Sequence, residues 1–187
     1  ITLVLCCLVH AQTREADSLK SLIKSAKEDT TRVNSLIALS GTLLRSNSGD
    51  ALRYANEAKS LADKLGFRKG QAYALKSIGM GYYFQGNYIE TLLYWQQSLE
   101  TFQSLGDKLG IANMLNNLGA VNFNEGDDEK AIDFYPESLR VSEEIGDKLR
   151  IATALVNIGA VYFNKKGTHD RALQYYLKAL PLSEELG

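Results

Sequence analysis

The stretch GDKLGIANMLNNLGAVNFN, Gly106 to Asn124, decides the fold because it occurs twice. It returns 40 residues later as GDKLRIATALVNIGAVYFN, Gly146 to Asn164, with 13 of its 19 positions identical. A fixed period of this length indicates a repeat architecture, in which each repeat buries its apolar face against the next one. The sequence therefore predicts a stack of similar repeats instead of a single closed core.

The composition excludes an electrostatic nucleic-acid binder and favours helices. The chain of 187 residues carries 21 Lys and Arg against 22 Asp and Glu, so its formal net charge is −1. With the two signs balanced, no basic surface for nucleic acid is expected. The only two prolines are Pro136 and Pro181, and this scarcity fits an all-helical fold because proline is poorly tolerated inside helices.

Residues 1–11 are predicted to be the remnant of a secretory signal peptide. The apolar run ITLVLCCLV ends at Val9, and Val9 and Ala11 occupy the −3 and −1 positions of a cleavage site after Ala11. An uncleaved anchor and a buried strand are the alternatives. Cleavage predicts an exported protein of the periplasm or another extracytoplasmic space, and it removes Cys6, Cys7 and His10. Disulfides, thiol catalysis and Cys/His zinc sites are then excluded, so no metal or cofactor is predicted.

Residues 12–30 are predicted to form a short N-terminal capping helix. The apolar residues recur at i, i+3, i+4 and i+7, on one face of an amphipathic helix: Leu19, Leu22, Ile23 and Ala26. Such a helix is expected to cover the first apolar edge of the array.

Four helical hairpins follow, in repeats of about 31–65, 68–105, 108–145 and 148–187. The predicted helices are 31–45 and 50–65, 68–84 and 88–105, 108–124 and 128–145, and 148–165 and 169–186. Polar turns separate the two helices of each hairpin, at residues 46–49, 86–87, 126–127 and 167–168. Each turn pairs Gly, which ends helices, with Asn, Asp or Thr, which begin them.

Aligning the hairpins by their turns superimposes a set of large, small and aromatic residues. In the first helices the matched positions are Leu75, Leu115 and Leu155; Ile78, Leu118 and Ile158; and Gly79, Gly119 and Gly159. In the second helices they are Thr91, Ala131 and Ala172; Trp95, Tyr135 and Tyr176; and Ser98, Ser138 and Ala179. The first hairpin keeps part of the second-helix set, with Ala51, Tyr54 and Ala58.

This pattern of Leu, Gly and aromatic residues, followed by Ala–aromatic–Ala, resembles the tetratricopeptide repeat. The period of about 40 residues, with Gly-Asp-Lys between repeats, is similar to the longer-period subfamily of G-protein-regulator scaffolds and of extracytoplasmic regions in bacterial signalling proteins. The resemblance covers residues 31–187 and is strongest over 68–187. It implies an all-α, right-handed α-solenoid of about four helix-turn-helix repeats behind a short N-terminal helix.

The glycines inside the first helices predict close packing. An interior glycine costs about 0.5–1 kcal/mol relative to alanine, so three glycines at one register indicate a close helix contact that offsets the cost. Gly119 and Ala131 are expected to let two helices approach, with Tyr135 filling the gap to the following repeat. Pro136 departs from the pattern inside a helix. A local kink is the expected result, and a hinge that tunes the curvature of the groove is the alternative.

No group of residues predicts catalysis. His169 begins a predicted helix, where polar side chains cap the helix or face solvent. The acidic pairs at 143–144 and 184–185 are neighbours in a helix and therefore point in different directions. A protein that is not an enzyme is expected.

The resemblance also implies a candidate site, because the first helices of such repeats line a concave groove that takes an extended peptide or a partner's helix. The corresponding residues are Tyr73, Lys76, Met80, Tyr83 and Phe84 in the second repeat, Asn113, Asn116, Asn117 and Asn124 in the third, and Thr153, Asn157 and Asn164 in the fourth. An asparagine side chain both donates and accepts, so a ladder of them can pair with a peptide backbone in either direction. Asn117 and Asn157 match an asparagine that contacts cargo peptide in related scaffolds. The alternative is that these asparagines are solvated.

Two functions fit these observations. The leading hypothesis is a non-enzymatic scaffold that binds a protein or peptide partner, and no nucleic acid, in its groove. The alternative is the sensor or dimerisation region of a longer bacterial signalling protein, whose kinase, cyclase or transcription-regulator domain is missing here. Leu186-Gly187 corresponds to a repeat boundary, so we expect either a longer protein or a homo-oligomer formed through this end. A membrane contact is expected only through a missing anchor.

Overall fold

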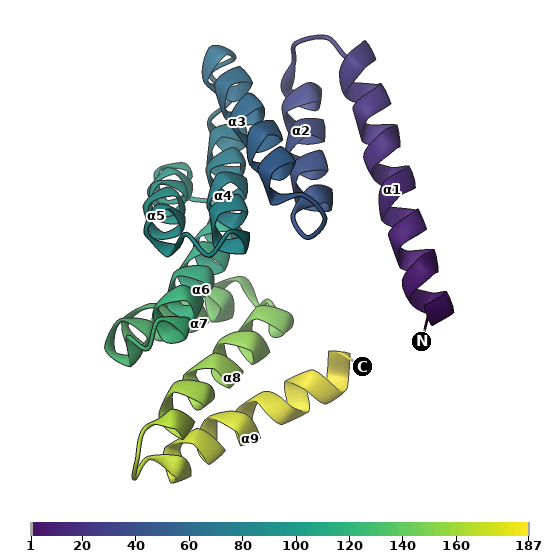
Figure 1. Ribbon diagram of the computed structural model, residues 1–187. Coiled ribbons are helices and arrows are strands. Elements are labelled where there is room, and N and C mark those ends of the chain that lie inside the picture. Colours follow the sequence, from purple (N-terminus) through teal and green to yellow (C-terminus); the bar gives the residue numbers. More distant parts are fainter. Residues whose placement is uncertain (1, 187) are drawn as a thin grey trace. The chain divides into compact units, whose positions relative to one another are not determined.

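The computed structural model describes the backbone of residues 2–186 and the side chains of residues 14–186. This part of the chain contains nine α-helices and no strand (Figure 1). The helices are α1 (Thr2–Ser25), α2 (Thr30–Leu43), α3 (Ser48–Lys64), α4 (Arg68–Phe84), α5 (Tyr88–Leu105), α6 (Lys108–Asn124), α7 (Asp128–Ile145), α8 (Lys148–Asn164) and α9 (His169–Leu186). None of these helices, as far as they are described, is long and apolar enough to cross a membrane.

The predicted all-α repeat fold is confirmed, and the hairpins fall where the turns indicated. Helices α4, α5, α6, α7 and α9 begin and end at the predicted residues, and α8 ends one residue earlier. The first hairpin differs most. Helix α3 begins at Ser48 because the side chain of Asn47 accepts a hydrogen bond from the N–H of Asp50 at 3.0 Å and caps the helix. Gly49, which was predicted in the turn, is therefore helical.

Helix α1 is longer than the predicted capping helix at its start and shorter at its end. It runs through the predicted cleavage position after Ala11, and it ends at Ser25. The side chains of residues 1–13 lie outside the described residues, so cleavage stays a prediction. Ala16 and Ile23 are buried against α2, whereas Leu22, predicted on the same face, is 47% exposed. The buried stripe is narrow, and the main contact of α1, as far as its residues are described, is with α2.

The chain divides into two compact halves, residues 1–101 and 102–187. In the first half, α1, α2, α3 and α4 pack in succession around a core that includes Val33, Leu36 and Leu39. In the second half, α6, α7, α8 and α9 pack in succession, with Ile158 and Val161 in the core. Within each half, the first helices of successive hairpins also touch, α2 with α4 and α6 with α8. This contact creates the face that carries the candidate site.

The repeated Gly-Asp pair forms the junction between hairpins. Gly146 has a φ of 68°, in the left-handed region that glycine adopts without steric cost, and its N–H donates to the carbonyl of Glu143. Asp147 then caps α8, because its side chain accepts a hydrogen bond from the N–H of Arg150 at 3.0 Å. Asp107 caps α6 in the same way, through the N–H of Gly110 at 3.0 Å. One residue ends a helix and the next begins another, which explains why the pair recurs.

The glycines of the repeated register lie under aromatic rings. A Cβ on Gly119 would stand 2.7 Å from Cε1 of Tyr135, in the second helix of the same repeat. Gly79 and Trp95, at 2.3 Å, and Gly159 and Tyr176, at 2.6 Å, show the same contact. The close packing was therefore predicted correctly, but a ring makes it, and not the approach of two backbones. Tyr135 also packs with Ile158 and Val161, so it reaches the following repeat as predicted.

Both prolines lie inside helices and on their solvent side. Helix α7 continues from Asp128 to Ile145 through Pro136, and α9 continues through Pro181. Both proline rings are exposed. Because the rings face away from the core, the missing N–H of each proline disturbs no contact between helices. The kink at Pro136 stays a prediction.

Candidate functional site

The candidate site is the face on which α6 and α8 touch, hereafter the first-helix face of the second half. An asparagine pair joins the two helices: Nδ2 of Asn157 donates to Oδ1 of Asn116 at 2.8 Å. Both side chains are half-buried. Because each amide carries a donor and an acceptor, each keeps hydrogen-bonding capacity beyond this bond.

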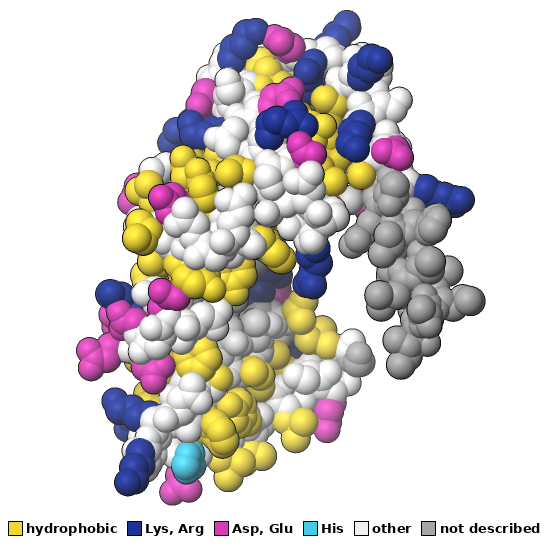
Figure 2. Space-filling view, in the orientation of Figure 1, with side chains coloured by type: hydrophobic (Ala, Val, Ile, Leu, Met, Phe, Trp, Pro, Cys, Tyr) yellow, Lys and Arg dark blue, Asp and Glu magenta, His cyan; other side chains and the backbone are white. Residues whose placement is uncertain are grey.

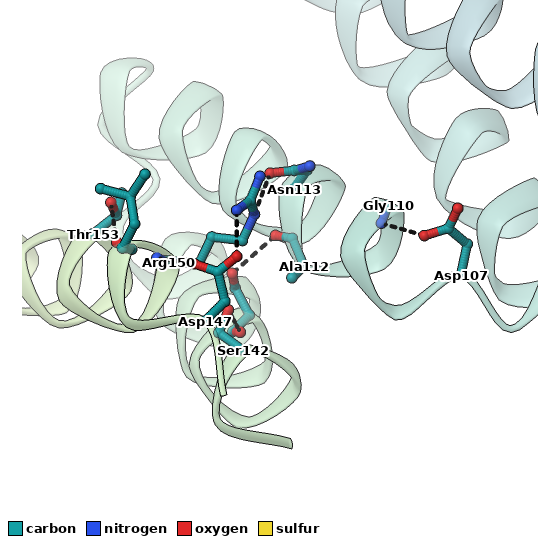
Figure 3. A network of polar contacts seen from close by, with 10 residues as sticks. Asp107, Gly110, Ala112, Asn113, Ser142, Asp147, Arg150 and Thr153 are labelled. Atoms are coloured by element: carbon teal, nitrogen blue, oxygen red, sulfur yellow. Dashed lines mark hydrogen bonds and ion pairs between the residues drawn. The ribbon is translucent and has the colours of Figure 1, made fainter. Parts of the chain in front are cut away.

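Arg150 makes the second link between the two helices. Its Nε donates to Oδ1 of Asn113 at 2.9 Å, and its Nη1 donates to Oδ2 of Asp147 at 2.6 Å. Figure 3 shows the guanidinium lying between these two side chains. The N–H of Arg150 is the largest cause that holds the pKa of Asp147 below its ordinary value, ahead of the guanidinium itself. The pair is thus an ionised carboxylate next to a cation, and its net charge is zero.

Two hollows lie along this face and meet each other. The first has a volume of about 180 Å³ and is lined by Ala112, Asn113, Asn116, Ser138, Leu149, Arg150 and Thr153. The second, of about 360 Å³, is lined by Leu149, Ala152, Thr153, Val156, Asn157, Ser183 and Leu186. They share two lining residues, Leu149 and Thr153, so they are neighbours on this side of the second half. The polar side chains are concentrated in the first hollow, and the apolar ones in the second.

A family model that describes the tetratricopeptide repeat matches residues 70–135 and 110–185, which together are more than half of the chain. The chain belongs to the tetratricopeptide repeat family. A search of curated proteins finds no match.

Solved structures with the same tetratricopeptide repeat fold include aspartyl phosphate phosphatase F from Bacillus subtilis, with a TM-score of 0.84 and 15% identity over 92% of this chain and 45% of that one. A signal transduction ATPase with numerous domains and a tetratricopeptide repeat sensor, from Pyrococcus horikoshii, gives a TM-score of 0.77 and 21% identity over 88% of this chain and 25% of that one. NprR in complex with its cognate peptide NprX gives a TM-score of 0.68 and 22% identity over 97% of this chain and 52% of that one. This chain therefore spans about half or less of each of these proteins.

The third and fourth tetratricopeptide repeats bring part of the predicted asparagine ladder together. Asn113 and Asn116 line the first hollow, and Asn157 and Thr153 line the second. Asn117, which was matched with Asn157, is half-buried and lines neither hollow. The partner of Asn157 is Asn116, because the two repeats are offset so that position 157 meets position 116. Asn124 and Asn164 are exposed at the ends of α6 and α8, away from both hollows.

The predicted groove residues of the second repeat are partly packing residues. The ring of Tyr83 stacks on Trp95 with centroids 5.8 Å apart, so it lies between α4 and α5. The carbonyl of Lys76 accepts a hydrogen bond from the indole N–H of Trp95 at 3.1 Å. Tyr73 lies under the ammonium group of Lys69, Met80 is half-buried, and Phe84 is 39% exposed. These contacts of Tyr83 and Lys76 fix the hairpin.

Sequence analysis missed Arg150 and Leu149. Arg150 follows Gly110 by 40 residues and Gly70 by 80, so it is the one charged side chain at a register that otherwise holds glycine. A Cβ on Gly110 would stand 2.3 Å from Cδ1 of Phe102, whereas Ser142 occupies the position of Phe102 before Arg150. The large Phe102 is thus followed by Gly110, and the small Ser142 by Arg150. That exchange was the signal for Arg150.

The described side chains do not gather into a metal site. No three His, Cys, Asp or Glu side chains among residues 14–186 could hold a metal ion together. The His169 ring lies 5.3 Å from the ring of Phe163, centroid to centroid, at the start of α9. What the first-helix face offers is hydrogen-bonding groups next to an apolar floor.

Proposed function

We propose that this chain is a non-enzymatic scaffold that binds an extended peptide, or a helix, of a partner protein on the first-helix face of the second half. One observation carries the proposal: Asn113, Asn116 and Arg150 line one hollow, and Asn157, which is hydrogen-bonded to Asn116, lines its neighbour. Membership of the tetratricopeptide repeat family supports it, as does the peptide complex of NprR, which has the same fold.

The charge of the face favours peptide backbone over a charged ligand. Asp147 neutralises Arg150, so the hollow carries amide and hydroxyl groups without a net charge. The hydroxyl of Thr153 already donates to the carbonyl of Leu149 at 2.8 Å. Amide groups such as those of Asn113 and Asn116 complement the N–H and C=O groups of an extended chain. Leu149, Val156 and Leu186 then provide apolar surface for the side chains of the peptide.

The test replaces the two asparagines that pair with each other. Partners are captured on the purified chain, and overlapping peptides of the captured proteins are titrated by fluorescence anisotropy. Asn116→Ala with Asn157→Ala is expected to weaken binding at least about tenfold, since interface residues that pair with a ligand dominate its affinity. The melting temperature should change little, because both partners of one bond are removed together.

Asn164→Ala is the matched control, because Asn164 is exposed on α8 outside both hollows. It is expected to leave peptide affinity unchanged. Equal affinities for the wild type and the double variant would reject the groove. Asn117→Ala tests which asparagine of α6 acts together with Asn157. It should weaken peptide binding less than Asn116→Ala does, because Asn117 lines neither hollow.

A second candidate function is the sensor region of a longer, exported signalling protein. It is favoured by the similarity to a protein with a tetratricopeptide repeat sensor, of which this chain covers 25%. The apolar run of residues 1–9 supports export. The complete gene tests the first part, since an output domain after residue 187 is required. Mass spectrometry of the protein from its native host tests the second, and a chain that keeps residues 1–11 would contradict cleavage.

A further inference from the structure

The asparagines of the first hollow present their nitrogens to a ligand. Oδ1 of Asn113 accepts a hydrogen bond from Nε of Arg150 at 2.9 Å, and Oδ1 of Asn116 accepts one from Nδ2 of Asn157 at 2.8 Å. Each bond orients its amide, and neither Nδ2 of Asn113 nor Nδ2 of Asn116 donates to another described residue. Figure 3 shows the amide oxygen of Asn113 turned to the guanidinium and its nitrogen turned away. Two amide NH2 groups therefore remain as donors.

The other polar groups that line the first hollow add a donor and few acceptors. Arg150 donates from Nε and Nη1, and its Nη2 has no partner among the described side chains. The hydroxyl of Ser138 donates to the carbonyl of Ala112 at 2.9 Å, so these two groups already satisfy each other. The hydroxyl hydrogen of Thr153 is likewise committed to the carbonyl of Leu149, and only the Thr153 oxygen can still accept. The hollow therefore offers mainly N–H groups.

The charge around the hollow disfavours an anion as the acceptor for these donors. Oδ2 of Asp147 lies 2.6 Å from Nη1 of Arg150 and neutralises the guanidinium. Residues 102–187 hold 13 Asp and Glu against 9 Lys and Arg, and Figure 2 shows both signs on the visible side of this half. A carboxylate would therefore enter a half with an excess of negative charge. The neutral acceptors of a peptide are its carbonyl groups, and these fit the donors without that cost.

An ordinary extended peptide brings an N–H with each carbonyl. An N–H that enters a hollow of donors loses its water without gaining an acceptor, and this loss weakens binding. Proline has no N–H, and the polyproline II conformation that it favours leaves the backbone carbonyls free of internal hydrogen bonds. Leu149, which is 58% exposed and lines the hollow, provides apolar surface for a proline ring.

We propose that the first hollow binds a proline-rich, extended segment of the partner protein through the carbonyl groups of its backbone. Asn113, Asn116 and Arg150 donate to these carbonyls. The bonds of Asn157 and Asp147 hold the three donors in position. This inference rests on the scaffold function proposed above, and it names the class of peptide that the scaffold takes.

Fluorescein-labelled peptides of about twelve residues test the proposal on the purified chain by anisotropy. They repeat Leu-Xaa-Ser, where Xaa is proline, N-methylalanine, alanine or aspartate. Proline and N-methylalanine both lack the N–H, so both of these peptides are expected to bind, and the alanine peptide to bind at least about tenfold more weakly. The N-methylalanine peptide separates the missing N–H from the shape of the ring. The aspartate peptide should bind no better than the alanine peptide, even at low salt, where attraction to an anion is strongest.

Asn113→Asp with Asn116→Asp removes two donors and keeps the shape of both side chains. Each carboxylate can still accept the bond that the amide oxygen accepted, so the melting temperature should change little. Binding of the proline peptide is expected to weaken at least about tenfold, because oxygen replaces the donating nitrogen. Asn117→Asp with Asn164→Asp is the matched control, since it adds the same charge outside both hollows. It should leave the affinity unchanged.

Three results would overturn the proposal: the alanine peptide binding as well as the proline or N-methylalanine peptide, the aspartate peptide binding more tightly than the proline peptide, or equal losses in the two double variants. The scaffold function would still stand after any of them if peptides of the captured partners bind and respond to Asn116→Ala with Asn157→Ala. Failure of every designed and captured peptide to bind would overturn both.

Discussion

The first and third repeats solve the same packing problem in opposite ways. In the third, Gly119 of the first helix lies under the ring of Tyr135 from the second. In the first repeat Leu36, Leu39 and Ser40 match Leu75, Ile78 and Gly79 of the second repeat by sequence and burial, so Ser40 takes the place of the glycine. The residue at the position of Tyr135 is the fully buried Ala55, one residue after Tyr54, the aromatic residue that was matched there by sequence.

The two arrangements also differ in which helix donates the hydrogen bond. Where the first helix has Ser40, its hydroxyl donates to the carbonyl of Ala51 in the second helix at 2.7 Å. In the third repeat the direction is reversed, and Ser138 of the second helix donates to the carbonyl of Ala112 in the first at 2.9 Å. In both repeats a buried serine hydroxyl therefore joins the two helices, and at least one residue of each contact is small. A small residue tolerates a ring across from it, and a larger one requires a small partner.

The largest expected effect comes from removing the ring. Tyr135→Ala should destabilise the chain by about 3–5 kcal/mol, because a large buried side chain is lost and Gly119 provides nothing to fill the cavity. Chemical denaturation followed by circular dichroism measures it. Tyr176→Ala, at the same position of the fourth repeat, should cost less because Tyr176 is only half-buried. A loss below about 1 kcal/mol for Tyr135→Ala would contradict the packing role of the ring.

Gly119→Leu should overpack the same contact and destabilise by about 1–3 kcal/mol, seen as a lower melting temperature. Even a Cβ at this position stands 2.7 Å from the Tyr135 ring, so the ring must move. Combining Gly119→Leu with Tyr135→Ala moves the bulk from the second helix to the first and leaves a small residue on the second. The double variant should lose less stability than the sum of the single ones. If the two losses of stability simply add in the double variant, residues 119 and 135 do not compete for the same space.

The smallest effect is expected for the buried hydroxyls. Ser40→Ala and Ser138→Ala should each cost about 0.5–1.5 kcal/mol, the usual contribution of one such hydrogen bond. The Ser40 bond is donated from the first helix to the second, and the Ser138 bond from the second to the first. Similar losses of stability in the two variants would show that the stabilisation does not depend on which helix donates. Ser→Ala without any change in the denaturation midpoint, at either site, would show that the bond contributes nothing there.

Much of the fold was predictable because its signals are local and repeated. The turn residues Gly126 and Asp127, and the junction residues Gly146 and Asp147, fix helix ends through their own backbone and caps. The glycine register was predictable for the same reason, since interior glycine is costly unless something approaches it. What approaches Gly119 could not be read from Gly119 itself, because Tyr135 lies in another helix and only the structure gives the direction of its ring.

The site was less predictable because its bonds join different repeats. Arg150 and Asn113 are 37 positions apart, and Asn157 and Asn116 are 41 apart, so neither bond follows the 40-residue period. A sequence alignment pairs Asn157 with Asn117, its equivalent residue, whereas contact depends on how one repeat is displaced along the next.

The junction between hairpins has a consequence for how such a chain can be lengthened. Phe102 and Gly110 lie on opposite sides of one junction, and the Phe102 ring fills the space that a Cβ on Gly110 would need. Ser142 and Arg150 hold the matching positions at the next junction. Duplicating residues 106–145 would place a copied Gly110 behind Ser142 and leave a void where Phe102 belongs. Duplicating residues 86–125 keeps Phe102 with Gly110 and still sets an aromatic residue, Trp95, over a glycine. The block that can be copied intact therefore runs from one hairpin turn to the next, and not from one helical pair to the next.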